Sequence, residues 1–136
     1  MQNAFQNLNW LAIIVAAVSA FVLGALWYSP LLFVKRWKKE SGVTDEMVKN
    51  TNMVQLFGLS FLLSLIASFF LAMFIGAKAG AGFGAMAGFM AGLGWVFTFM
   101  GISYLFERKS LVHFLINSLY SIVSLTIMGL IIGAWQ

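Results

Sequence analysis

Five polar residues recur at helical spacing within the last apolar stretch of the chain. They are His113, Asn117, Tyr120, Ser121 and Ser124. Their steps of 4, 3, 1 and 3 residues place all five on one face of a helix. Asn117 is the most informative of them, because an amide group in hydrocarbon must find a hydrogen-bond partner.

Two interpretations of this polar face remain open. In the first, it lines a path or a small-molecule site together with Ser60 and Ser64, which lie four residues apart in an earlier apolar stretch. In the second, its side chains hold helices together by hydrogen bonds worth roughly 0.6–2 kcal/mol each. His113 is likewise either a proton-binding or gating group, with an ordinary pKa of about 6.5, or a boundary residue that hydrogen bonds a carbonyl or a lipid headgroup.

The remaining polar residues give little support to catalytic or metal chemistry. The chain has no cysteine and one histidine, which cannot supply the three or four ligands of a zinc site. No acidic or basic residue lies in the core of an apolar stretch, which weighs against a simple proton-coupled carrier. Glu107 has no second acid or base beside it, and we expect it to pair with Lys35 or Arg36. We expect no catalytic residue, no cofactor, no metal and no enzymatic activity.

The elements that must position these residues are membrane helices. Of the 136 residues, 62% are hydrophobic and 9% are charged, whereas soluble domains carry about 25% charged residues. Four stretches without Lys, Arg, Asp or Glu each exceed the roughly 20 residues that cross a bilayer core. The sequence predicts an all-α bundle of four transmembrane helices in one domain, residues 1–136. The spans are expected at about 9–34, 53–75, 83–106 and 111–135.

Two local signals add detail to the first span and to the loop that follows it. Pro30 lies near the end of the first span and is expected to kink it, because proline removes a backbone hydrogen bond. Thr44 precedes Asp45 and Glu46 in the 35–52 loop. This order is typical of a helix N-cap followed by an acidic first turn.

Small residues four apart run along every predicted span, and glycine dominates the third. The glycines expected at helix contacts are Gly84, Gly88, Gly92, Gly129 and Gly133. In lipid, small side chains let two helix backbones approach closely, as in a glycine zipper. Because this stripe exceeds what one hairpin needs, we expect a homo-oligomer, most simply a two-fold dimer.

Basic residues are distributed unequally between the predicted loops. Seven of the eight lie after the first or the third span, and only Lys78 lies between the second and the third. By the positive-inside rule, the 35–52 and 107–111 loops face the cytoplasm, and both termini and the 77–82 turn lie outside. The basic loop is expected to meet anionic lipid of the bilayer. No nucleic-acid binding is expected, because acidic residues dilute that loop.

Several segments carry a family resemblance. They are Asn9-Trp10-Leu11-Ala12, Leu26 to Phe33 with its Trp27-Tyr28-Ser29-Pro30 element, Gly58 to Ser64, Tyr104 to Arg108, Leu115-Ile116-Asn117 with Tyr120, and Met128-Gly129 with Trp135. Over essentially the whole chain they resemble the bacterial membrane family called domain of unknown function 1761. The resemblance implies a four-helix integral membrane protein, and it implies no activity. We expect the protein in the bacterial cytoplasmic (inner) membrane.

Two classes of function therefore stay open. One is a small homo-oligomeric transporter or channel whose path lies at a subunit interface. The residues expected to line that path are Ser60, Ser64, Asn117, Tyr120 and Ser121. The other is an accessory protein that packs against another membrane protein through its small-residue faces.

Overall fold

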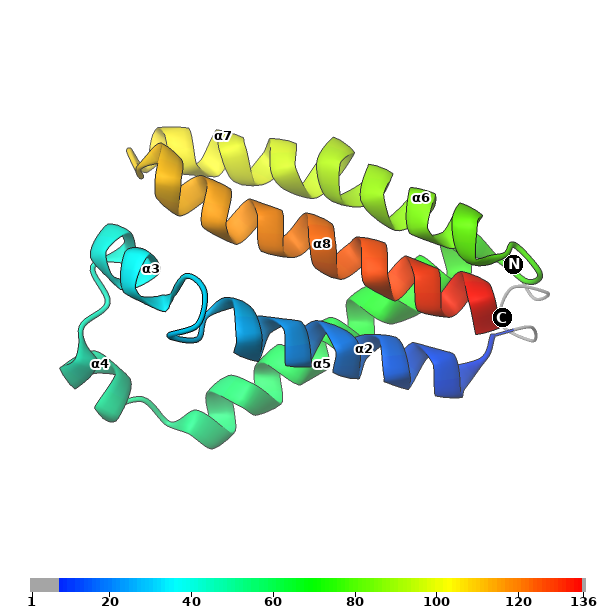
Figure 1. The fold of residues 1–136 in the computed structure, drawn as a ribbon, viewed down its shortest axis with the longest axis horizontal. Coiled ribbons are helices and arrows are strands. Elements are labelled where there is room, and N and C mark those ends of the chain that lie inside the picture. The colour runs from blue at the N-terminus through cyan, green and yellow to red at the C-terminus, as the bar shows by residue number, and fades with distance from the viewer. Residues whose placement is uncertain (1–7, 136) are drawn as a thin grey trace.

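The computed structural model describes residues 8–135, which form helices joined by short turns (Figure 1). In chain order they are α2 (Trp10–Trp27), α3 (Val34–Ser41), α4 (Asp45–Lys49), α5 (Met53–Ile75), α6 (Ala81–Ala91), the π-helical segment η1 (Gly92–Phe97), α7 (Thr98–Phe106) and α8 (Leu111–Trp135). Within these residues, α2, α5, the continuous run α6–η1–α7, and α8 are long and apolar enough to cross a membrane. The predicted all-α bundle of four such helices is confirmed.

Large apolar side chains cover the outside of the bundle, and small residues fill much of its interior. Val54, Leu105 and Phe106 are more than three-quarters exposed, whereas Ala12 and Ala16 are fully buried. A soluble helical protein would bury its large apolar side chains. In a bilayer these side chains are already in an apolar solvent, so burying them gains no hydrophobic free energy. The helices are therefore held by close approach and by hydrogen bonds.

The closest approach joins α6 to α8. A Cβ atom added to Gly88 would lie 1.9 Å from the carbonyl oxygen of Leu125, and one added to Gly129 would lie 2.1 Å from that of Gly84. No larger residue fits without moving backbone. The five glycines predicted at helix contacts all lie here, facing the partner helix: Gly84, Gly88, Gly92, Gly129 and Gly133. Because this contact lies within one chain, the stripe does not support a dimer, which stays a prediction.

The first span is shorter than the predicted 9–34. α2 ends at Trp27, and a turn precedes α3. Pro30 lies in that turn, so the helix stops there and does not merely kink, because proline has no N–H to continue the hydrogen-bond ladder. The carbonyl of Leu26 accepts from the backbone N–H and from the hydroxyl of Ser29, at 3.2 and 2.6 Å. Ser29 thus caps the end of α2.

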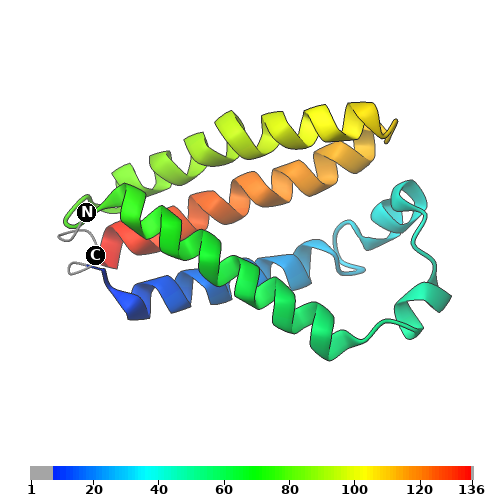
Figure 2. The ribbon, with the colours of Figure 1, turned by 180° about the vertical axis from the view of Figure 1, so that it is seen from behind.

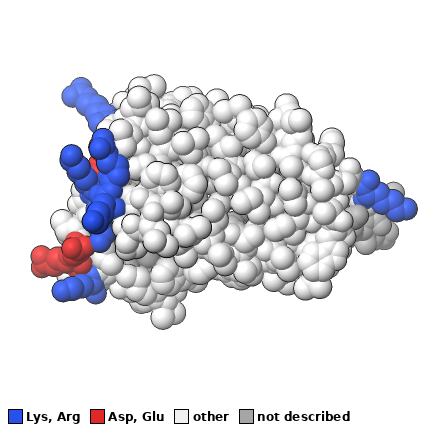
Figure 3. All heavy atoms as spheres, in the orientation of Figure 1, with Lys and Arg blue, Asp and Glu red and all other residues white. Residues whose placement is uncertain are grey.

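The predicted 35–52 loop contains two short helices. α3 was not expected. α4 begins as predicted, with Thr44 as its N-cap accepting the N–H of Met47 at 3.2 Å. Figure 3 shows Lys and Arg side chains gathered at this end of the molecule, whereas Lys78 lies in the turn between α5 and α6 at the other end. We call the end with α3, α4 and residues 107–110 the charged end, and the end with the 76–80 turn the glycine end.

The two ends differ in how far the helices separate. At the glycine end, the Asn9 side-chain amide donates to the carbonyl of Trp135 at 3.0 Å. There too, the Gly80 N–H donates to the carbonyl of Gly133 at 3.1 Å. Toward the charged end, α5 and α7 diverge, as Figures 1 and 2 both show. This divergence leaves room for a site among α2, α5, α7 and α8.

Candidate functional site

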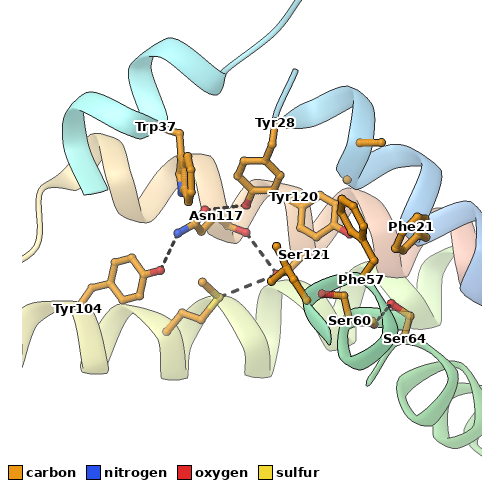
Figure 4. Close-up of a pocket in the computed structure, with 14 residues that line it drawn as sticks. Phe21, Tyr28, Trp37, Phe57, Ser60, Ser64, Tyr104, Asn117, Tyr120 and Ser121 are labelled. Carbon is orange, nitrogen blue, oxygen red and sulfur yellow. Dashed lines mark hydrogen bonds between the residues drawn. The ribbon is translucent and has the colours of Figure 1, made fainter. Parts of the chain in front are cut away.

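A groove of about 780 Å³ occupies the charged half of the bundle (Figure 4). Side chains from α2, α3, α5, α7 and α8 line it, together with Tyr28 from the turn after α2. Pockets of this volume hold small organic ligands. We call it the Tyr–Asn groove, after the residues that define it: Tyr28, Tyr104, Asn117 and Tyr120.

Asn117 lies at the centre of the Tyr–Asn groove and bridges two tyrosines. Tyr28 donates from its hydroxyl to Asn117 Oδ1 at 2.6 Å, and Asn117 Nδ2 donates to the hydroxyl oxygen of Tyr104 at 2.8 Å. Figure 4 shows the amide between the two rings. The bridge ties α8 to the end of α2 and to α7. The predicted interhelical role of Asn117 is therefore visible, and the residue faces the groove as well.

Two further hydrogen bonds hold α2 against α8. The Tyr120 hydroxyl donates to the carbonyl of Ala20 at 2.8 Å, and Trp27 Nε1 donates to the carbonyl of Ile116 at 2.9 Å. Gly24 makes room for the Tyr120 ring, since a Cβ there would lie 2.9 Å from its hydroxyl oxygen. The chain has three tyrosines, and all of them line this one groove.

The residues predicted to line a path converge in the Tyr–Asn groove of a single chain. They are Ser60, Ser64, Asn117, Tyr120 and Ser121. Ser64 donates to the carbonyl of Ser60 at 2.9 Å, and Ser121 donates to the carbonyl of Asn117 at 3.3 Å. The hydroxyl of Ser60 has no hydrogen bond within residues 8–135. Two transmembrane helices that are not neighbours in sequence thus present hydroxyls to one space.

The other two members of the predicted polar face lie outside the groove. His113 and Ser124 are each 5% exposed. The His113 ring packs on Tyr104, with 5.2 Å between the ring centroids. Ser124 Oγ has no hydrogen-bond partner in the described part of the chain. The helix face was predicted as one surface, but the groove spans only its middle turns.

No charged side chain lines the Tyr–Asn groove. The ionisable groups instead pair with one another at the charged end. Arg36 Nε lies 3.1 Å from a carboxylate oxygen of Glu40. A hydrogen bond from Ser110, and after it the charge of Arg36, hold the pKa of Glu40 below its usual value. Because Ser110 also caps α8 by accepting the N–H of His113, Glu40 ties α3 to the start of α8.

The expected partner of Glu107 was wrong. Glu107 lies 3.8 Å from Lys109 on its own turn, not against Lys35 or Arg36. The contact between α3 and the start of α8 runs through Glu40 and Ser110 instead.

Sequence reasoning missed the aromatic part of the groove. Trp37 stands between two basic residues, and Tyr28 and Tyr104 lie a few residues before the basic loops, where aromatic side chains usually mark a membrane interface. Tyr28 instead lies 5.5 Å from Trp37 and 5.6 Å from Tyr120 between ring centroids. The available signal was the position of the Trp27-Tyr28 pair just before Pro30, but no local rule says that these side chains face the interior of the bundle.

No curated protein and no solved structure matches the chain. Residues 11–133 match one family, and this range covers all four long helices almost completely. The match includes every residue that defines the Tyr–Asn groove and every glycine of the α6–α8 contact. The chain therefore belongs to the family described as protein of unknown function (DUF1761).

Proposed function

We propose that the protein is a small membrane transporter that binds an amphipathic organic molecule in the Tyr–Asn groove. The observation that carries the proposal is the convergence of hydroxyl, amide and aromatic groups on one space among membrane helices. Such groups fix and orient a ligand without charge. The path would lie within one chain, and the proposal needs no subunit interface.

The contrast between the two ends of the bundle supports movement of the ligand. At the glycine end, α6 and α8 meet backbone to backbone and leave no space between them. In the other half, α5 and α7 stand apart (Figure 2). A bundle closed at one end and open at the other has the form of one state of an alternating-access carrier. The groove then lies in the open half of the bundle.

For the orientation, we propose that the charged end faces the cytoplasm of a bacterial cell. Lys and Arg gather there, and short basic loops stay on the cytoplasmic side. Both termini and Lys78 then lie outside. Reporter fusions test this directly: a periplasm-active phosphatase is expected to work when joined after residue 136, and not when inserted at Gly42 between α3 and α4.

Native mass spectrometry of the full chain in native-lipid nanodiscs tests the binding. We expect a retained small molecule on the wild type and its loss in Ser60→Phe, which places a ring in the groove without breaking a side-chain hydrogen bond. Leu59→Phe is the matched control, because Leu59 is 51% exposed and faces away from the groove. Uptake of the retained molecule into proteoliposomes then tests transport. A wild type that retains nothing, or a Ser60→Phe variant that retains as much, would contradict the proposal.

A further inference from the structure

The Tyr–Asn groove has hydrogen-bond donors that lack acceptors. Tyr104 accepts from Asn117, but its own O–H donates to nothing within residues 8–135. The Ser60 O–H is also uncommitted there, and Asn117 uses one of its two amide hydrogens. An unmet donor costs more free energy than an unused lone pair. What the groove lacks is therefore an acceptor.

The charge distribution selects against an ionised ligand. A carboxylate or phosphate in the groove would leave water with no cationic side chain to receive it. An ammonium group would bring more donors to a site that already has too many. An uncharged ligand meets neither penalty.

The rim of the groove indicates where the ligand enters. Leu56 and Phe57 of α5 line the groove and are also 46% and 52% exposed on the apolar outer surface. At the charged end, the Trp37 ring of α3 extends over the groove beside Asn117 (Figure 4). The groove therefore opens sideways toward the bilayer, between the diverging α5 and α7. A ligand with an apolar chain suits this opening.

We propose that the Tyr–Asn groove binds an uncharged lipid-soluble molecule through a carbonyl oxygen, as in a ketone, ester, amide or quinone. The carbonyl accepts from the free donors of Tyr104 and Asn117, which lie next to each other, and the apolar chain extends between α5 and α7. This inference rests on the proposed function and names the chemical class of its ligand.

Three photoreactive probes with the same short alkyl chain test the choice of head group. One carries a methyl ketone, one no polar group, and one a trimethylammonium group, each with a diazirine at the chain end. They are added to the full chain in nanodiscs, and labelled peptides are identified after illumination. We expect saturable labelling by the ketone on α5 and α7. The two other probes are expected to bind roughly 3- to 10-fold more weakly, as one hydrogen bond predicts.

Single-group variants test which donors are used. Tyr104→Phe is expected to weaken ketone labelling roughly 3-fold or more, and to leave labelling by the hydrocarbon probe unchanged. Thr98→Val is the matched control, because Thr98 also carries a hydroxyl on α7 but bonds the carbonyls of Gly94 and Trp95 in its own helix run. Equal effects on ketone and hydrocarbon would overturn the assignment.

The outcomes separate this inference from the proposed function. Preferred labelling by the ammonium or hydrocarbon probe, blocked by Ser60→Phe, would overturn the carbonyl ligand and leave a binding groove in place. Labelling by every probe that Ser60→Phe does not reduce would overturn both. Ketone labelling that needs Tyr104 and is blocked by Ser60→Phe would support both.

Discussion

The two halves of this bundle solve the same packing problem in different ways. In the glycine half, α6 and α8 touch through main-chain atoms, and each contact glycine faces a carbonyl oxygen or a Cα atom of its neighbour. In the charged half, side chains of α2, α7 and α8 meet through Tyr28, Tyr104 and Asn117. The first arrangement excludes any space, and the second encloses a groove.

The difference shows what each kind of contact makes possible. A backbone contact has one geometry and few ways to change, because any added atom collides with the partner helix. A contact made by side-chain hydrogen bonds can exchange partners, since tyrosine and asparagine both donate and accept. Rigidity is therefore expected in the glycine half and ligand response in the charged half.

The largest expected effect comes from a substitution that disrupts the α6–α8 contact in the glycine half. Gly88→Leu should lower the free energy of unfolding by about 3 kcal/mol or more, because its Cβ would overlap the carbonyl of Leu125. Thermal unfolding in detergent measures the loss. Gly94→Leu is the control, since a Cβ at Gly94 meets nothing within 4 Å. Equal stability of the two variants would mean that α6 and α8 are not in backbone contact.

The next largest effect is expected from a substitution of Asn117, whose side chain joins Tyr28 and Tyr104 in the charged half. Asn117→Leu should cost about 2 kcal/mol, because it deletes two interhelical hydrogen bonds and leaves the tyrosine hydroxyls without them. Chemical unfolding in bicelles gives the value. A double-mutant cycle with Tyr28→Phe should show a coupling of about 1 kcal/mol. Strict additivity would argue that the Tyr28–Asn117 bond does not form in the membrane.

A pair of serines one turn apart on α5 sharpens the comparison. Ser68 is fully buried and donates to the carbonyl of Ile13 on α2 at 2.8 Å, whereas Ser64 faces the groove and bonds its own helix. Ser68→Ala should destabilise the protein by about 1 kcal/mol, and Ser64→Ala by about zero. Measuring the free energy of unfolding of both variants under one condition tests whether α5 is bonded to α2 at Ser68 but not at Ser64, where it lines the groove.

The smallest effect concerns pH at the charged end. Because the pKa of Glu40 in the folded protein lies below its unfolded value, its contribution is present above the unfolded pKa and is lost as the pH falls through the folded one. Below about pH 4, α3 should loosen from Ser110, and tryptophan fluorescence should report the change at Trp37. The Glu40→Gln variant should lack this transition. A transition of the same size in that variant would assign it to another group.

Much of this architecture could be predicted because it depends on local properties of the chain. The lengths of the apolar stretches predict four helices, and α5 begins at Met53 and ends at Ile75, the bounds expected for the second span. Glycines four apart predict a close helix contact, but spacing along one helix does not say which helix is the partner. Only the fold places the glycines of α6 against Gly129 and Gly133 within the same chain.

The groove was less predictable, for a related reason. Spacing could place Asn117 and Tyr120 on one helix face, but their partners lie 89 and 100 residues earlier in the chain. The end of α2 depended on whether Pro30 bends a helix or ends it, and both outcomes suit the same sequence. After the end of α2, the Tyr28 side chain points into the groove, and the local sequence does not predict this orientation.

The pairing of α2 with α8 also sets the order of events during synthesis. The first long helix in the chain bonds its neighbour through contacts that span up to 126 residues, from Asn9 to Trp135. A ribosome adds roughly 5–20 residues per second, so the nascent α2 waits several seconds in the bilayer before its partner emerges. During that interval the carbonyl of Ala20 has no bond from Tyr120, and Trp27 Nε1 has no bond to the carbonyl of Ile116. The hydrogen bonds between α2 and α8 therefore form only after α8 has entered the membrane.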